Sequence, residues 1–179
     1  MNIHDYNKIM VAGGFAAGKS WLAKHIALLT GYPLYHLDVE FWQPGWQKPP
    51  EEVFLARQKE IMSSSKWIID GNYRVGRDLR WANADLIIHV DIGRFRRLIS
   101  AARRHGKKRS DLPDYLHEDS WFSREFIGVI KMIWATHNKD RKMVFAMREK
   151  HADTAFLHIK SRRDMRRLLN EWRAVSEYS

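Results

Sequence analysis

The sequence predicts an α/β fold in which a parallel sheet is covered by helices on both faces. Short apolar segments alternate with longer segments of helical period along most of the chain. A glycine-rich loop joins the first predicted strand to the first helix, and three predicted strands end in an aspartate. No repeat and no low-complexity linker interrupts this alternation, so residues 1–179 are expected to form a single domain.

The first half of the chain supplies four of the five predicted strands. They are expected at 8–12, 33–37, 66–69 and 84–90. Each is a short apolar run, which is typical of strands that are buried on both faces of a sheet. The first helix follows the glycine-rich loop and ends before Gly31 and Pro33, residues that stop helices. A second helix is expected at 51–63, where apolar residues recur at helical spacing after Pro50.

The second half of the chain is expected to be mainly helical. A helix is predicted at 94–105, because its apolar residues recur at i, i+3, i+4 and i+7. This apolar stripe consists of Phe95, Leu98, Ile99 and Ala102. Residues 106–119 have turn composition and are expected to form a short lid. The other expected elements are helices at 120–137 and 138–150 with a break between them, a strand at 155–159 and a helix at 162–174.

The composition is that of a globular protein and excludes several classes. Eight Trp, eight Phe and six Tyr are too much apolar surface for a disordered chain. The absence of cysteine excludes a disulfide scaffold. No apolar run approaches the length of a membrane span, and the first residues are polar. A cytoplasmic protein with no membrane partner is therefore expected, and both a monomer and a homodimer fit the sequence.

Basic residues are concentrated in the second half of the chain. The formal charge is +10, and residues 92–179 carry 21 basic side chains against 11 acidic ones. The densest block is 94–109, where eight of sixteen residues are basic and none is acidic. Such a block suits nucleic acid, phospholipid or a phosphorylated small molecule, but it is also compatible with a solvated helix face.

The glycine-rich loop matches the pattern G-x-x-x-x-G-K-S at every position. It reads Gly13-Gly14-Phe15-Ala16-Ala17-Gly18-Lys19-Ser20, and it lies between a predicted strand and a predicted helix, as this phosphate-binding loop requires. Its backbone N–H groups and the start of the helix would surround a phosphate. Lys19 would reach the β- and γ-phosphates, and the Ser20 hydroxyl would bind Mg²⁺. ATP is the implied nucleotide.

Aspartates follow three of the predicted strands, at the sheet edge where ligands bind in open α/β proteins. Asp70 follows the apolar run 67–69 and is expected to position Mg²⁺ together with Ser20. Asp38 is a candidate to accept or orient the proton of an acceptor hydroxyl. For Asp91 the capping of a turn is the favoured interpretation.

Two tryptophans and several histidines are further candidates. Trp42 and Trp46 flank a Pro-Gly turn and are expected to form an aromatic wall for the acceptor, although core packing is also compatible with them. The nine histidines show no metal-binding spacing, so no dedicated metal site is expected among them. His36 and His89 lie inside predicted strands and are expected to be satisfied core or edge residues.

The size and the motifs together favour a small kinase. No guanine-reading N-K-x-D segment and no D-x-x-G motif is present, which argues against a GTPase, and the chain is short for a motor or a helicase. An arginine-rich lid would neutralise the transferred phosphoryl group and exclude water. The arginines expected to contact phosphate are Arg103, Arg104 and Arg109, with catalytic roles for the last two. Those expected to be partly structural are Arg94, Arg96 and Arg97.

These segments resemble a known family. Residues 11–20, 70–74 and the arginine-rich helix before a short lid resemble the adenylate-kinase-like P-loop kinases. His36-Leu37-Asp38, the segment 41–46 and Asp70-Gly71-Asn72-Tyr73 resemble, within them, the proteins known as DNA topology modulation proteins. This resemblance implies a three-layer α/β/α fold with five parallel strands in the order 2-3-1-4-5. It also implies that Tyr73 and Arg74 face the acceptor.

The chain departs from adenylate kinases in two places. The segment between the second and third strands is short and rich in tryptophan, and the lid is brief and has no cysteine. AMP is therefore not the expected acceptor.

Two functions remain open from the sequence. The first is a Mg²⁺-dependent phosphotransferase that moves the γ-phosphate of ATP to a small acceptor. The alternative is an ATP-binding regulator of DNA topology that binds nucleic acid with its basic C-terminal half. The basic residues of the last helix that would take part are Lys160, Arg162, Arg163, Arg166 and Arg167.

Overall fold

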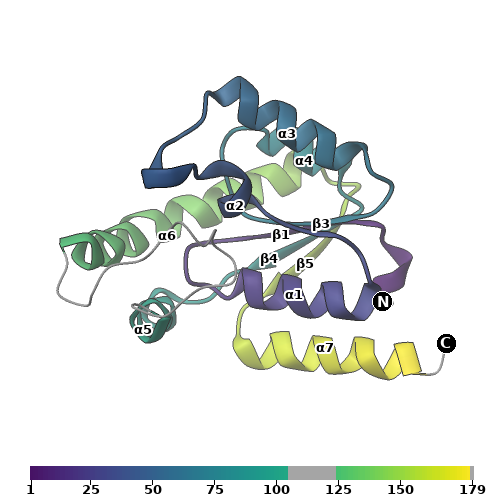
Figure 1. Ribbon diagram of the computed structural model, residues 1–179. Coiled ribbons are helices and arrows are strands. Elements are labelled where there is room, and N and C mark those ends of the chain that lie inside the picture. Colours follow the sequence, from purple (N-terminus) through teal and green to yellow (C-terminus); the bar gives the residue numbers. More distant parts are fainter. Residues whose placement is uncertain (105–123, 178–179) are drawn as a thin grey trace.

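The protein is described by a computed structural model, which covers residues 1–104 and 124–177 (Figure 1). The predicted lid at 106–119, including Arg109, lies outside the described residues. For Arg104 the backbone is described and the side chain is not. The proposed roles of these two arginines therefore remain predictions.

A five-stranded parallel sheet forms the centre of the fold, in the order β2-β3-β1-β4-β5. This order and the α/β class are as the sequence and the family resemblance predicted. The strands are β1 (Lys8–Gly13), β2 (Leu34–His36), β3 (Trp67–Asp70), β4 (Leu86–Val90) and β5 (Ala155–Ile159). Because all pairings are parallel, the carboxyl ends of the strands share one edge of the sheet.

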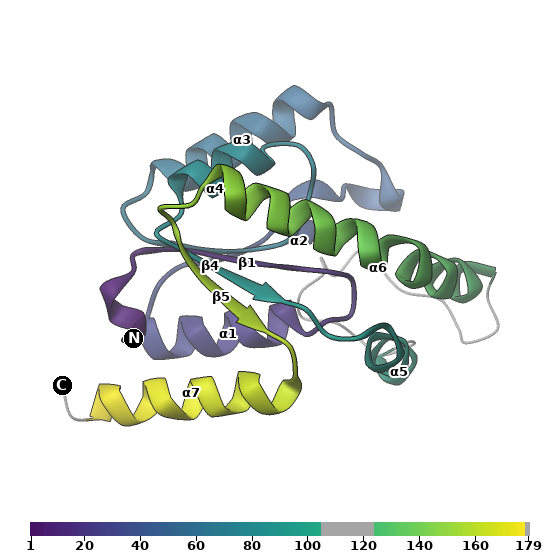
Figure 2. The same ribbon diagram turned by 180° about the vertical axis from the view of Figure 1, so that it is seen from behind.

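Helices cover both faces of the sheet, as Figures 1 and 2 show from opposite sides. Helices α1 (Lys19–Thr30) and α7 (Arg162–Glu177) lie on one face. The other face carries α2 (Leu37–Phe41), α3 (Glu51–Ser63), α4 (Arg77–Asn83) and α6 (Arg124–Lys150). Helix α5 (Arg94–Arg104) follows β4 and packs beside α6. Short 3₁₀ turns occupy Ile3–Asp5 and Pro44–Trp46.

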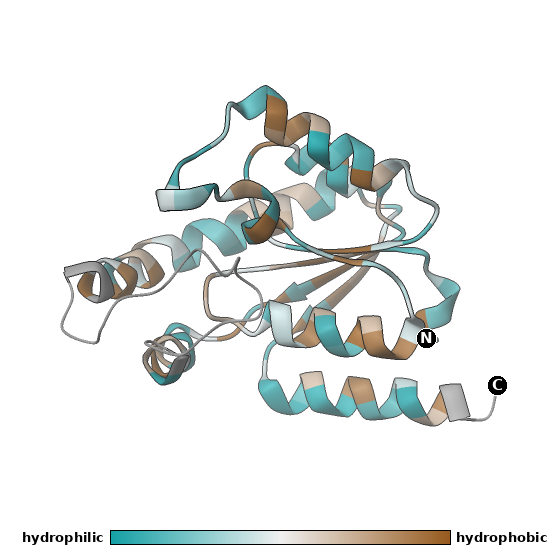
Figure 3. Ribbon diagram, in the orientation of Figure 1, coloured by the Kyte–Doolittle hydropathy of each residue, from teal (hydrophilic) through white to brown (hydrophobic). Residues whose placement is uncertain are grey.

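The core has one apolar layer on each side of the sheet. Ile9 and Val11 of β1 pack toward α1 and α7, where Trp172 is fully buried. Met10 and Ala12 point to the opposite face and pack with α3, α4 and α6. Alternate side chains of one strand thus enter two different cores, which is why β1 reads as an unbroken apolar run. Figure 3 shows apolar residues along β4 and β5, between helices of mixed surface.

The structure differs from the sequence-based elements in a helix break, a strand end and an unpredicted helix. Helix α6 runs without a break, because buried Ile133 and Val144 anchor it on both sides of the polar segment at 138–140. The second strand ends at His36, so Asp38 lies in the first turn of α2 rather than at a strand end. Helix α4 was not predicted, because its seven residues are largely polar and begin after Gly76.

The helix predicted at 94–105 is present as α5, but its apolar stripe is not its buried face. Phe95 is 68% exposed and Ile99 is 52% exposed, whereas Arg97 and Ala101 are buried. An apolar stripe usually packs on an apolar core, whereas α5 packs beside the phosphate loop. The two buried residues that face the phosphate loop are Arg97 and Ala101, which lie one helical turn apart.

None of the helices in residues 1–104 and 124–177 combines the length and the hydropathy required to cross a membrane.

Candidate active site

The phosphate loop connects β1 to α1 at the carboxyl edge of the sheet. Gly13 is the last residue of β1, residues 14–18 form the loop, and Lys19 and Ser20 begin α1. Gly18 adopts φ 98°, a left-handed conformation that favours glycine, and this turn lets the helix start immediately after the loop. The remaining members of the predicted cradle, Gly14, Phe15, Ala16 and Ala17, lie in this same turn of chain.

The start of α1 presents free donors to the loop. The Leu22 N–H bonds to the Gly18 carbonyl as the first bond of the helix, so the N–H groups of residues 19–21 remain available for an anion. Within the loop, the Ala17 N–H already bonds to the Gly14 carbonyl. Lys19 Nζ folds back and donates to the Gly14 carbonyl oxygen at 3.1 Å. The ammonium group therefore lies over the loop, where it could reach a bound phosphate by a small rotation.

Asp70 ends β3, next to the strand that carries the loop. It is in register with Val11 of β1 and with His36 of β2. The Asp70 carboxylate is 5% exposed, and its Oδ2 accepts a hydrogen bond from His36 Nδ1 at 2.9 Å. Its other oxygen, Oδ1, is buried and has no hydrogen-bond partner among the described residues. Such an orphaned carboxylate oxygen suits Mg²⁺ or one of its bound waters, so this residue fits the predicted metal role.

Asp38 and Tyr73 form a second polar pair. The Tyr73 hydroxyl donates to Asp38 Oδ1 at 2.8 Å. Burial and, second, the Asp38 charge raise the pKa of Tyr73, so this phenol stays protonated and keeps donating. The pair joins α2 to the loop that follows β3, and it fixes one oxygen of the carboxylate.

Aromatic rings surround this pair, and they include Trp42 and Trp46, which the sequence predicted to form an aromatic wall. The ring of Phe41 lies 4.5 Å from that of Tyr73 and 4.9 Å from that of Trp42, measured between centroids. Trp42 in turn contacts Trp46 at 5.4 Å in an edge-to-face arrangement. Trp46 remains 44% exposed. The two tryptophans thus form the open end of an aromatic cluster whose inner end is the buried Phe54.

Cations near this cluster are already paired. Arg57 donates to Glu40 at 2.7 Å and to Glu60 at 2.8 Å. Arg74 is 83% exposed and lies 3.7 Å from Glu51. The sequence placed Arg74 at the acceptor, whereas the structure places its side chain at the surface.

Arg80 is a buried residue that sequence reasoning missed. It is fully buried on α4 and donates to the carbonyls of Tyr73, at 2.5 Å, and Val75, at 2.8 Å, and to the Gln58 side chain. Burial and, second, the charge of Arg77 lower its pKa to about 9. Arg80 therefore holds the loop that carries Tyr73. No sequence signal marked it, because an arginine in a short polar helix usually predicts a solvated side chain.

A cavity of about 240 Å³ lies beside the phosphate loop, between the beginnings of α1 and α7. Its lining consists of Ala17, Gly18, Trp21, Arg162, Met165 and Arg166. The Trp21 ring is 42% exposed and lies 4.0 Å from the His25 ring. Two arginines that the sequence offered for nucleic acid therefore line a cavity at the phosphate loop. Arg103 is exposed on α5.

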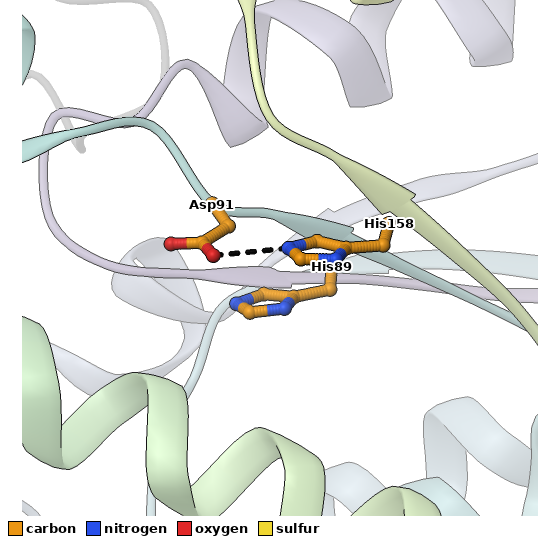
Figure 4. A group of neighbouring side chains, drawn as sticks. All are labelled: His89, Asp91 and His158. Carbon is orange, nitrogen blue, oxygen red and sulfur yellow. Dashed lines mark hydrogen bonds and ion pairs between the residues drawn. The ribbon is translucent and has the colours of Figure 1, made fainter.

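A histidine–aspartate cluster lies at the carboxyl ends of β4 and β5 (Figure 4). His158 Nε2 is 2.9 Å from Asp91 Oδ2, and the rings of His89 and His158 are stacked 5.2 Å apart. Their ligand atoms lie within 4.8 Å of one another, a grouping that could hold a metal ion. Sequence spacing did not indicate this cluster, because its members come from two strands.

Two features argue for a structural role of this cluster. Arg141 Nε lies 3.4 Å from the same Asp91 oxygen, so the carboxylate already has a cationic partner. The two imidazoles are nearly parallel, at 6°, whereas a shared ion would require both ring planes to converge on it.

His89 Nδ1 is buried and has no hydrogen-bond partner among the described residues. The expectation that the polar atoms of His89 are satisfied was therefore wrong. Burial lowers the pKa of His89 to about 4.

Comparison with solved structures places the chain among P-loop kinase folds. Shikimate kinase from Bacteroides thetaiotaomicron is similar with a TM-score of 0.58 and 12% identity, covering 96% of this chain and 99% of that one. Deoxyadenosine kinase from M. mycoides with bound dATP is similar with a TM-score of 0.53 and 13% identity, covering 91% and 97%. No protein-family model and no curated protein matches the sequence.

These likenesses show a P-loop kinase-like fold. They do not show membership of the DNA topology modulation family, which remains a resemblance of short segments.

Proposed function

We propose that this protein is a phosphotransferase that uses ATP and Mg²⁺ to phosphorylate a small acceptor. One observation carries the proposal: a complete phosphate loop ends β1, and the adjacent strand β3 ends in a buried carboxylate with an unpaired oxygen. This combination supplies both an anion site and a metal ligand at one sheet edge. The likeness to two kinases of this fold supports it.

The nucleotide would bind along the loop and the start of α1. The N–H groups of residues 14–20 would hold the phosphates, and Lys19 would leave the Gly14 carbonyl to reach the β- and γ-oxygens. Ser20 and Asp70 would hold Mg²⁺, which when bound neutralises charge on the phosphates. The cavity beside Gly18 would take the base, with Trp21 as an apolar wall. Arginines 103, 104 and 109 would complete the charge around the γ-phosphate.

The acceptor would bind between Asp38 and the two tryptophans. Asp38 would accept or orient the proton of the attacking hydroxyl, while Tyr73 holds the carboxylate by donating to its other oxygen. Trp42 and Trp46 would cover an apolar or ring-shaped part of the acceptor.

The charges around Asp38 favour an uncharged acceptor. Two arginines of this region, Arg57 and Arg74, are paired with glutamates, and Arg80 donates to backbone carbonyls of the Tyr73 loop. An acceptor with its own phosphate or carboxylate would therefore meet Asp38 and Glu40 without a free cation from these residues. A hydroxyl compound with a planar ring and no anionic group fits this surface best.

The nucleic-acid alternative is not favoured. Arg162 and Arg166 line the cavity at the phosphate loop, and Arg167 lies 3.7 Å from Glu171. Two of the five basic residues proposed for nucleic acid therefore lie on the nucleotide side, which does not favour a separate nucleic-acid surface on this helix.

The proposal is tested by ADP formation from ATP and Mg²⁺ in the presence of nucleosides, nucleoside monophosphates and small hydroxylated metabolites. Lys19→Ala is expected to abolish acceptor-dependent turnover, and Asp38→Asn to lower kcat while ATP binding is kept. The matched control is Lys59→Ala, which removes an exposed lysine of α3. Binding of ATP without turnover for any acceptor would contradict the proposal.

A further inference from the structure

Arg97 places a buried guanidinium directly against the phosphate loop. The residue lies on α5 and is 2% exposed. Its Nε donates to the Phe15 carbonyl of the loop at 2.7 Å. Its Nη1 lies 3.2 Å from Nδ1 of His137, on α6. Arg97 thus joins the loop to two helices that are distant in sequence.

The contact with the loop is closest at Gly14. A Cβ on Gly14 would lie 2.3 Å from Arg97 Cζ, far inside van der Waals contact, so a side chain cannot be accommodated there unless Arg97 moves. The carbonyl of the same glycine accepts the hydrogen bond from Lys19 Nζ. The two cationic side chains therefore bond to the carbonyls of consecutive loop residues, Lys19 to Gly14 and Arg97 to Phe15. Lys19 of this motif reaches the β- and γ-phosphates, so Gly14 lies on the γ-phosphate side of the loop.

The charge of Arg97 has no directly bonded anion among the described residues. Its described partners are a carbonyl and an imidazole, and Nη2 is buried without a partner. Asp140 and Asp91 act on it only through space, and burial lowers the pKa of Arg97. A guanidinium buried without a bonded carboxylate is costly to the folded protein. That cost is offset when a ligand brings negative charge beside the guanidinium. The neighbouring phosphate loop would bind such a ligand.

His137 on α6 keeps its hydrogen bond with Arg97 near neutral pH. Burial, followed by the charge of Arg97, lowers the pKa of His137, so its ring stays neutral and its Nδ1 can accept from Arg97. The other charged groups that act on this ring are Asp91, Arg94 and Arg141. The guanidinium is therefore held by a neutral acceptor, and its full charge is left for the loop.

We infer that Arg97 is a second cation of the phosphate site and a positioning residue for the triphosphate. It fixes the Phe15–Ala16 peptide by donating to the Phe15 carbonyl, and its buried charge stabilises the terminal phosphate more than the inner ones. This inference rests on the proposed function. It predicts that Arg97 sets the preference for ATP over ADP, because ATP adds negative charge on the γ-phosphate side.

The test compares ATP and ADP binding by calorimetry in Arg97→Met and Arg97→Lys, with Mg²⁺ present. We expect the ATP dissociation constant of Arg97→Met to rise by about tenfold or more and that for ADP to rise by less than about threefold. Arg97→Lys should recover part of the ATP preference, because lysine keeps the positive charge but lacks the planar set of guanidinium N–H donors. Arg96→Met is the matched control, since it removes an exposed arginine from the same helix.

Thermal melts accompany each titration, so that loss of fold is separated from loss of binding. Should Arg97→Met fail to fold, Arg97→Lys and Gly14→Ala carry the test. The added methyl group of Gly14→Ala displaces the guanidinium and should lower the ATP preference in the same direction.

Equal weakening of ATP and ADP, or no weakening in a folded Arg97 variant, would overturn the assignment and leave the proposed function standing. A wild-type chain that binds neither nucleotide would overturn both.

Discussion

His89 couples the stability of this protein to pH. It lies on β4 beneath α6, it is 2% exposed, and its ring is packed against those of Phe145, Phe156 and His158. Desolvation and, to a smaller extent, the charges of His158 and Arg141 lower its pKa from 6.5 to about 4, while the Asp91 charge opposes this shift. The unfolded chain therefore takes up a proton near pH 6.5 that the folded protein does not bind until about pH 4.

The sign follows from proton binding in the two states. Between these two pH values the unfolded state binds more protons, so the free energy of unfolding is highest above pH 6.5 and decreases as the pH falls. A difference of this size corresponds to a loss of about 3 kcal/mol when the transition is complete, and of about 2 kcal/mol already at about pH 5. The pKa of His137 is also lowered, which adds a loss of the same sign.

The assay is urea unfolding of wild type and His89→Phe between about pH 8 and about pH 5. The phenyl ring keeps the aromatic packing and removes the buried nitrogen that has no partner, so we expect little change in stability near pH 8. The decrease toward pH 5 should shrink by about 2 kcal/mol in this variant. A variant that loses as much stability as wild type over the same range would refute the assignment of the decrease to His89.

Three further predictions concern the site. Tyr73→Phe removes the donor to Asp38 and should lower turnover by about tenfold with nucleotide affinity unchanged, as steady-state kinetics and calorimetry would show; weaker nucleotide binding would contradict it. Asp70→Asn should weaken ATP binding in Mg²⁺ but not in EDTA, so parallel losses in both titrations would argue against a metal role. Arg80→Met leaves buried carbonyls unpaired and should lower the free energy of unfolding by about 2 kcal/mol. Urea unfolding measures this loss, and an unchanged midpoint would contradict it.

The sequence predicted those parts of the fold that depend on local pattern. The strand order followed from the family resemblance, and the phosphate loop was found because its glycines and its Lys-Ser pair are adjacent in sequence. Asp70 was correctly expected at the ligand edge, because a strand end in a parallel sheet has a fixed relation to that edge, and its role in binding Mg²⁺ stays a prediction.

The remaining features depend on contacts between distant segments. Arg97 meets Phe15 across 82 residues, and His158 meets Asp91 across 67, so no local pattern marks either pair. The apolar stripe of α5 predicted the helix but not its buried residues, because the face that packs on the phosphate loop includes Arg97. Asp38 was expected at a strand end, since a short helix directly after a short strand leaves too few residues for a periodic signal.

Transfer of the γ-phosphate itself tests the central claim most directly. The measurement follows labelled γ-phosphate from ATP to a nucleoside and, in parallel, to its own 5′-monophosphate, with wild type and Lys19→Ala. The two acceptors share the ring and the sugar, and the monophosphate carries an anionic phosphate in place of the free 5′-hydroxyl, so the pair also tests the acidic surroundings of Asp38. We expect wild type to label an uncharged hydroxyl acceptor of this kind in preference to its monophosphate, and Lys19→Ala to label neither. Label that is released only as inorganic phosphate, whatever acceptor is offered, would contradict a phosphotransferase.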